Sequence, residues 1–166
     1  DMLENLFGLI TCYDADISMC NMIRVKNYEN IEVNNCNNVL VHTKQDFLDI
    51  MLRVNGNRCV HYAWGKLYKK SVLREEHYPV GLLNEDVEGT FKAVIKSKKI
   101  VETSKVGYYY FYNTSSITGQ VFGNNYLSLT TVWKRMVDIA KKEAPEYLDS
   151  VIYNQKRTTF TILCDM

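Results

Sequence analysis

The sequence has little net charge and lacks the long apolar run of a membrane-spanning segment. Its 166 residues carry a formal net charge of +1 at pH 7, so there is no excess charge to gather nucleic acid or an anionic membrane. No uninterrupted apolar run approaches the roughly 18 residues that a membrane-spanning helix needs. No signal peptide precedes the first predicted helix. These absences argue against nucleic acid as a partner and favour the cytoplasm as the location.

Cysteine pairs at metal-ligand spacing are also missing. The chain has five cysteines, an odd number, and none belongs to a Cys-x-x-Cys pair. This argues against a zinc site and against a disulfide framework. We expect small buried side chains in a reducing compartment for Cys12, Cys20, Cys36, Cys59 and Cys164.

Common catalytic and nucleotide-binding motifs are absent as well. The three histidines, His42, His61 and His77, have no metal-ligand spacing. The sequence contains no G-x-S-x-G elbow, no P-loop and no G-x-G-x-x-G. The hydrolase and nucleotide-fingerprint interpretations are therefore weak, and no metal site is predicted in this chain.

Hydrophobic periodicity nevertheless predicts a folded α/β chain. Apolar residues at helical spacing predict helices over 1–12, 43–54, 84–95 and 129–140, with a short one around 147–153. Alternating or β-branched and aromatic segments predict strands over 17–25, 39–41, 99–103 and 106–112. A mixed sheet flanked by helices follows, which in isolation reads as α+β. A complete nucleotide-binding sheet would need several parallel strands upstream.

The acidic pair Glu85-Asp86 is the strongest candidate for chemistry. It stands at the start of the predicted helix over 84–95, with Asn84 before it and Glu88 after it. These side chains could simply cap the helix and complement its dipole. They could also project a carboxylate into a cleft as a general base. Both roles are compatible, because a cap can position a base.

The segment Trp64-Gly65-Lys66 is the second candidate. Trp64 could be buried against the sheet, with Gly65 allowing close backbone approach and Lys66 in solvent. Alternatively, an aromatic face can stack on a sugar, and a lysine can pair with a phosphate or a sugar hydroxyl.

Residues 62–86 carry a family resemblance. The run YAWGKLY, followed by HYPVGLLNED, resembles the family-2 nucleotide-sugar glycosyltransferases, which have a WGKLY-like segment and then a Glu-Asp pair. The resemblance implies that Asp86 is the base of an inverting sugar transfer and that Glu85 is its partner. It implies an acceptor-side role for Trp64, Gly65 and Lys66. Val80 stands where the family has a glutamate, so the first acidic residue of that segment is lost.

The resemblance extends in weaker form over most of residues 1–120. Asp1 to Leu6 is similar to the helix that follows the family's Asp-x-Asp metal motif. The family also has a tyrosine-rich strand and a Ser-Ile segment, which match Tyr110 and Ser116 as substrate-binding candidates. Here Phe111 replaces the usual arginine, which puts a phosphate contact in doubt. Packing within a strand and capping of a loop are the plainer roles for Tyr110 and Ser116.

The resemblance implies a partial GT-A-like fold without its nucleotide-binding half. Residues 1–125 would be the acceptor-side part of the catalytic domain, and residues 126–166 a helical segment packed on it. The parent enzyme would transfer a sugar from a nucleotide-sugar to a glycan or lipid-linked hydroxyl acceptor, using Mg²⁺ or Mn²⁺ held by the other half. No cofactor is expected on this portion, which begins at Asp1 and would be inactive alone.

Two further expectations follow for a portion of this kind. It would self-associate through an uncovered sheet edge, and the parent would lie in the cytoplasm or at the inner face of the membrane. The alternative is a non-catalytic carbohydrate-binding or protein-interaction domain.

Overall fold

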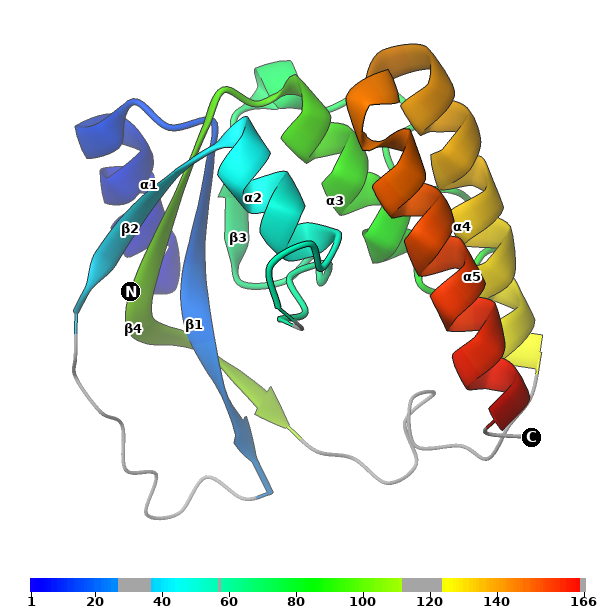
Figure 1. Ribbon diagram of the computed structural model, residues 1–166. Helices are drawn as coiled ribbons and strands as arrows, with labels where there is room; N and C mark the ends of the chain where they lie inside the picture. Colours follow the sequence, from blue (N-terminus) through cyan, green and yellow to red (C-terminus); the bar gives the residue numbers. More distant parts are fainter. Residues whose placement is uncertain (27–36, 57, 112–123, 165–166) are drawn as a thin grey trace.

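The protein is built on a four-stranded mixed sheet with the order β2-β4-β1-β3. The computed structural model describes residues 1–26, 37–56, 58–111 and 124–164. The two central strands, β1 (Ile17–Val25) and β4 (Lys99–Phe111), are parallel (Figure 1). The strands β2 (Val39–Thr43) and β3 (Lys66–Tyr68) flank them in antiparallel orientation. This confirms the α/β class and the mixed sheet.

Helices cover both faces of the sheet. On one face lies α1 (Met2–Tyr13), where the Ser18 hydroxyl donates to the Leu6 carbonyl at 2.8 Å. The helices on the other side are α2 (Lys44–Met51), α3 (Glu85–Lys96), α4 (Asn124–Glu143) and α5 (Leu148–Cys164) (Figure 1). Short 3-10 turns occur at Lys70–Val72 and Pro145–Tyr147. Among the described residues, no helix is both long and apolar enough to cross a membrane.

Local sequence signals explain how α2 begins and ends. Thr43 and Asp46 form a capping box, in which each side chain bonds the other residue's backbone N–H. The helix ends before residue 54, where the periodicity predicts its end, because Arg53 adopts the left-handed conformation with φ 59°. The Val54 N–H then bonds the Asp49 carbonyl at 2.8 Å, and the Arg53 N–H bonds Ile50 at 3.2 Å. This is a Schellman motif with arginine where glycine is usual.

Three other elements differ from the sequence prediction. The three-residue strand β3 was not expected, because its pattern is too short to show a period of two. The two strands predicted after Lys98 form one strand, β4, whose pairing with β1 shifts register between Met19 and Met22. The last helix, α5, is 17 residues long rather than short.

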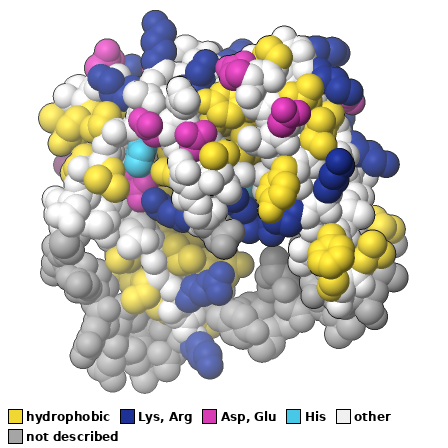
Figure 2. Space-filling view, viewed as in Figure 1, with side chains coloured by type: hydrophobic (Ala, Val, Ile, Leu, Met, Phe, Trp, Pro, Cys, Tyr) yellow, Lys and Arg dark blue, Asp and Glu magenta, His cyan; other side chains and the backbone are white. Residues whose placement is uncertain are grey.

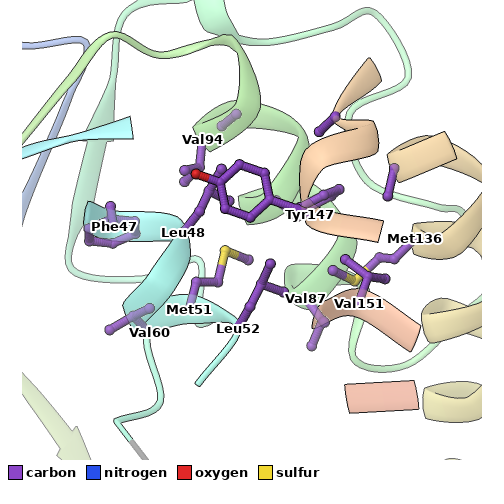
Figure 3. Close-up of a cluster of buried hydrophobic side chains, with 14 of the residues drawn as sticks. Phe47, Leu48, Met51, Leu52, Val60, Val87, Val94, Met136, Tyr147 and Val151 are labelled. Carbon is purple, nitrogen blue, oxygen red and sulfur yellow. The ribbon is translucent and has the colours of Figure 1, made fainter. Parts of the chain in front are cut away.

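The main core lies between the sheet and the helices α2 to α5. Phe47, Leu48, Met51 and Phe91 are at most 1% exposed. Figure 3 shows α2 and α3 side by side, with the Tyr147 ring pointing towards Leu48 and Val94. Full burial of one such side chain contributes about 1.5–3 kcal/mol, so this cluster holds the helices to the sheet.

The cysteines are less buried than we expected. Cys20 is buried, but Cys12, Cys59 and Cys164 are exposed and free, and Cys36 lies outside the described residues. The expectation of small core side chains is therefore wrong for three of them. The absence of a Cys-x-x-Cys pattern gave no information about burial.

A buried carboxylate joins α3 to α4. Glu88 is 0% exposed and accepts hydrogen bonds from Arg135 Nε at 2.6 Å and Nη2 at 3.0 Å. Lys92 Nζ lies 2.5 Å from Glu88 Oε1 and also approaches the carbonyls of Glu76 and His77 at 3.4 and 3.3 Å. Burial alone would raise the pKa of Glu88, but the bonds from Arg135 and Lys92 outweigh it, so the pKa lies below its usual value.

Glu88 lies in the first turn of α3, as expected, but it bonds Arg135 and Lys92 instead of capping the helix. Its side chain enters the interface between α3 and α4. We call Glu88, Lys92 and Arg135 the Glu88 cluster.

The Glu88 cluster gives a first prediction. Glu88→Gln should destabilise the fold by about 3–5 kcal/mol, because it leaves the buried Lys92 ammonium without its counter-charge. Urea unfolding measures this, and Asp138→Asn, at a carboxylate 72% exposed, is the matched control. A loss below about 1 kcal/mol, the range of surface ion pairs, would contradict a central role for this cluster.

Candidate functional site

The candidate site lies where the helical layer ends and the sheet continues. The 12 residues of α3 span about 18 Å, whereas the 13 residues of β4 span about 43 Å. Only Ser97 and Lys98 connect the end of α3 to the start of β4. The first turn of α3 therefore lies part-way along β4, and the far halves of β1 and β4 extend past it (Figure 1). This leaves a step between the start of α3 and the sheet.

Four aromatic side chains stack beside this part of β4. Trp64 stacks with Tyr62 at 3.9 Å and 10°, and with Tyr108 at 4.6 Å and 13°. Tyr110 meets the same indole at 5.5 Å with a tilt of 44°. We call these four residues the aromatic stack. The Tyr62 and Tyr108 rings are both nearly parallel to the indole of Trp64 and make no ring contact with each other. They therefore cover opposite faces of the indole, so a ligand can reach only its edge.

Gly65 sets the position of Trp64. Its φ of +65° is in the left-handed region, which glycine adopts without strain. Its carbonyl accepts the Cys20 N–H at 3.0 Å, which anchors the turn to β1. A Cβ at this position would lie 3.5 Å from Cys20 Sγ and 3.7 Å from Tyr108 Cβ. Backbone conformation is therefore the stronger reason for glycine here.

Lys66 is buried, contrary to the alternative in which its side chain lies in solvent. Lys66 pairs with Met19 on β1, and Met19 pairs with Glu102 on its other side. Paired residues point to the same face of a sheet, and Met19 is buried in the core, so the Lys66 side chain points to the core face. Only 8% of Lys66 is exposed. Its Nζ donates to the Tyr62 carbonyl and lies 3.7 Å from the centroid of the Tyr62 ring. Burial lowers the pKa of this ammonium to about 7.

Asp86 and Glu85 open the first turn of α3 and are both half-buried. Burial raises the pKa of the Asp86 carboxyl, and the neighbouring charge of Glu85 raises it further. The N–H of Val87 and the charge of Lys66 act in the opposite direction. The N-cap residue, Asn84, has φ 61° and makes no side-chain capping bond, so the capping role expected for its side chain is not found.

The structure thus brings the two parts of the 62–86 motif together. Lys66 and Asp86 act on each other's pKa in opposite directions, as an ammonium and a carboxylate in the same site must. Tyr68 and Tyr78 also lie within electrostatic reach of Asp86. The Tyr78 ring packs directly on Gly89, where any Cβ would overlap it. The loop before α3 is therefore seated on the helix close to Asp86.

A second, partly buried charge cluster was not expected from the sequence. Glu102, on β4, bonds His42 Nε2 at 3.2 Å and both terminal nitrogens of Arg58, one of them at 3.0 Å. Burial alone would raise the pKa of Glu102, but His42 and Arg58 lower it below its usual value. A glutamate between the β-branched residues Val101 and Thr103 was the available signal. The charge of Arg58 also reaches Tyr62, which links this cluster to the aromatic stack.

The remaining predictions for the site have different outcomes. Tyr110 belongs to the aromatic stack, whereas Ser116 lies outside the described residues. Lys66 does not face solvent, so a direct bond to a phosphate or sugar would require its side chain to move. Within the described ranges, no group of three or more His, Cys, Asp or Glu could hold a metal ion.

His61 is buried in neutral form, close enough to Lys66 for its charge to act on the imidazole. It is 7% exposed, and its ring meets Trp133 edge-on at 6.0 Å. Burial lowers the pKa of His61 to about 3, helped by the charges of Arg53, Lys66 and Arg157.

The Lys66–Asp86 interaction gives a second prediction. Lys66→Met removes the positive charge, so the pKa of Asp86 should rise. The chemical shift of the Asp86 carboxyl carbon in a pH titration of ¹³C-labelled protein measures it. Lys70→Met, at an exposed lysine, makes the same charge change and should leave the Asp86 titration unaltered. An unchanged Asp86 midpoint in Lys66→Met would show that the two groups are independent.

His61 gives a third prediction, on pH dependence. Below pH 6.5 the unfolded imidazole takes up a proton while the folded ring stays neutral down to about pH 3. Stability should therefore fall on acidification through this window by about 1.4 kcal/mol per pH unit from this group. His61→Gln lacks this contribution, so its unfolding free energy should depend less on pH between 6.5 and 3 in denaturant titrations. Equal pH dependence in both proteins would rule out a neutral buried ring.

Comparisons with known protein families and with curated proteins identified no relative of this chain. No model of a known protein family matches the chain, and no curated protein is similar to it. Its function is therefore inferred from its own residues, namely Asp86, Lys66 and the aromatic stack.

Proposed function

We propose that this chain is the acceptor-side portion of a glycosyltransferase that uses a nucleotide-sugar donor and has a GT-A-like fold. The parent enzyme transfers the sugar to a hydroxyl of a glycan or lipid-linked acceptor, in the cytoplasm or at the inner face of the membrane. Asp86 is the general base.

One observation carries this proposal. Asp86 is a half-buried carboxylate at the edge of the step, and its pKa is raised. A carboxylate in water has its midpoint near 4 and is a weak proton acceptor at neutral pH. Burial and the Glu85 charge make Asp86 more basic, which is what a general base requires. The cap of a surface helix has no need of such a shift.

The proposed reaction is a single displacement with inversion. Asp86 takes the proton of the acceptor hydroxyl while the oxygen forms its bond to the anomeric carbon of the donor sugar. The bond from that carbon to the diphosphate oxygen breaks, and the nucleoside diphosphate leaves with the electron pair. Lys66 opposes the rise in the Asp86 pKa, which favours the ionised carboxylate that a base needs.

The aromatic stack forms the wall along which the acceptor lies. Both faces of Trp64 are covered, so the indole serves as a rigid support, and Tyr110, which meets the indole at a tilt of 44°, is the ring that we assign to the sugar. Gly65 fixes the turn that carries Trp64. Of the candidates from the sequence, Lys66 is assigned to the charge of the site and not to direct contact.

The divalent cation implied by the family resemblance has no fitting ligands here. The described residues contain no group of carboxylates, histidines or cysteines that could hold it. No step is assigned to it on this chain.

The fourth prediction concerns Asp86 in the longer enzyme. Asp86→Asn keeps the shape of the side chain and removes its basicity, so turnover should fall by roughly 10²–10⁴ with little change in melting temperature. The rate of nucleoside diphosphate release in the presence of acceptor measures this. Asp138→Asn is the control, since Glu88→Gln would disturb the core.

The result also separates the alternatives. If Asp86 only complements the helix dipole, Asp86→Asn alters stability by under about 1 kcal/mol and leaves turnover intact. A non-catalytic carbohydrate-binding or interaction domain would show no sugar transfer in either protein.

A further inference from the structure

A basic cavity lies at the end of the sheet where β1 and β4 begin. Its volume is about 500 Å³, within the range of roughly 300–1,000 Å³ that small-molecule sites have. The cavity and Asp86 lie near opposite ends of α3, which is about 18 Å long. Figure 2 shows dark-blue side chains along the upper edge of the molecule, over this end of the sheet. Two aspartates and four lysines are among the described residues that line the cavity, the lysines being Lys69, Lys96, Lys98 and Lys99.

Asp16 holds three chain segments together around the cavity. Its carboxylate accepts the backbone N–H groups of Lys98 at 2.6 Å and Lys99 at 3.3 Å. Its own N–H donates to the Lys99 carbonyl at 2.8 Å, and its carbonyl accepts the Lys69 N–H at 2.8 Å. The turn after α1, the end of β3 and the turn between α3 and β4 are thereby fixed relative to one another. A ligand would therefore meet walls that are already in place.

Two of the four lysines already bond groups of the protein itself. Lys69 Nζ lies 2.8 Å from Asp14 Oδ1 and 3.7 Å from Asp16 Oδ1. Lys99 Nζ donates to the Tyr13 carbonyl at 2.8 Å, at the end of α1. These two lysines therefore support the walls of the cavity. The other two lysines are exposed.

The exposed lysines, Lys96 and Lys98, flank the buried Ser97. Ser97 has an extended conformation with φ −81° and ψ 152° and is 3% exposed, and its hydroxyl donates to the Ala93 carbonyl at 2.8 Å. In extended backbone the two neighbours of a buried residue point to the other side, so Lys96 and Lys98 project outward together, and both line the cavity. Lys96 also complements the C-terminal end of the α3 dipole, but Lys98 lies beyond the helix.

We propose that this cavity binds a phosphate group through the ammonium groups of Lys96 and Lys98, with the Ser71 hydroxyl as an additional donor. The lysines that line the cavity outnumber the aspartates by two. Phosphate carries close to two negative charges at neutral pH, whereas a carboxylate carries one, and lysine binds phosphate as a flexible point charge. Ser71 is exposed and lines the same cavity. The proposal does not depend on the proposed glycosyltransferase function, because Asp86 lies near the other end of α3.

Calorimetric titration of the whole chain at low, constant ionic strength tests this site. Inorganic phosphate, pyrophosphate and acetate are added separately, and we expect saturable binding of a phosphate species at one site and no binding of acetate. A parallel sedimentation experiment uses vesicles of phosphatidylcholine with or without phosphatidic acid, whose head group is a phosphate monoester. Binding of free phosphate or pyrophosphate assigns the site to a soluble ligand. Binding only to vesicles that contain phosphatidic acid assigns the same site to a lipid head group.

Substitutions separate this cavity from the general charge of the surface. Lys96→Gln and Lys98→Gln should each weaken binding about tenfold, the equivalent of one charge-assisted bond, with little change in melting temperature, because both side chains are exposed. Lys98→Arg keeps the charge and should keep most of the affinity. Lys156→Gln, at an exposed lysine on α5, is the matched control and should bind like the wild type. Absence of saturable binding to every phosphate ligand, equal binding of acetate, or equal affinity of Lys98→Gln and Lys156→Gln would overturn the proposal.

Discussion

The position of the candidate base depends on the contact between Glu88 and Arg135. A carboxylate that is 0% exposed cannot remain charged in a core without partners, because its desolvation is worth several kcal/mol. Arg135 from α4 and Lys92 from α3 supply them. The bond thereby fixes α3 against α4 only two residues after Asp86. Lys92 extends the same constraint to the carbonyls at 76 and 77, so the loop before α3 is held as well.

Burial makes the charged form of each ionisable group near the step less favourable, but the resulting pKa depends on the partners of that group. Burial raises the pKa of Asp86 and lowers that of Lys66, which moves both groups towards neutral pH, where proton transfer is easiest. Glu88 is buried and Glu102 is partly buried, but each receives bonds from two basic side chains and its pKa falls. Hydrogen-bond partners, and not burial alone, therefore distinguish the proposed base from the structural carboxylates.

Much of the secondary structure could be predicted from local signals in the sequence. The capping box at Thr43 and Asp46 acts over three residues, and the alternation in 17–25 reflects a single strand, so both could be predicted. The burial of Lys66 could not, because it results from pairing with Met19, 47 positions earlier in the chain. Glu88 stands directly beside Val87 in the buried stripe of α3. The Glu88 side chain points inward because Arg135 on another helix binds it. The periodicity of α3 alone cannot predict this contact.

Gly89 has a consequence for how relatives of this chain could be identified. The Tyr78 ring occupies the space that any side chain at position 89 would need, so even alanine would push the ring away from α3. A homologue that keeps Asp86 but replaces Gly89 must seat the preceding loop differently. Covariation of positions 78 and 89, an aromatic residue with a glycine, would therefore mark the sequences that preserve this loop, even where the surrounding motif has diverged.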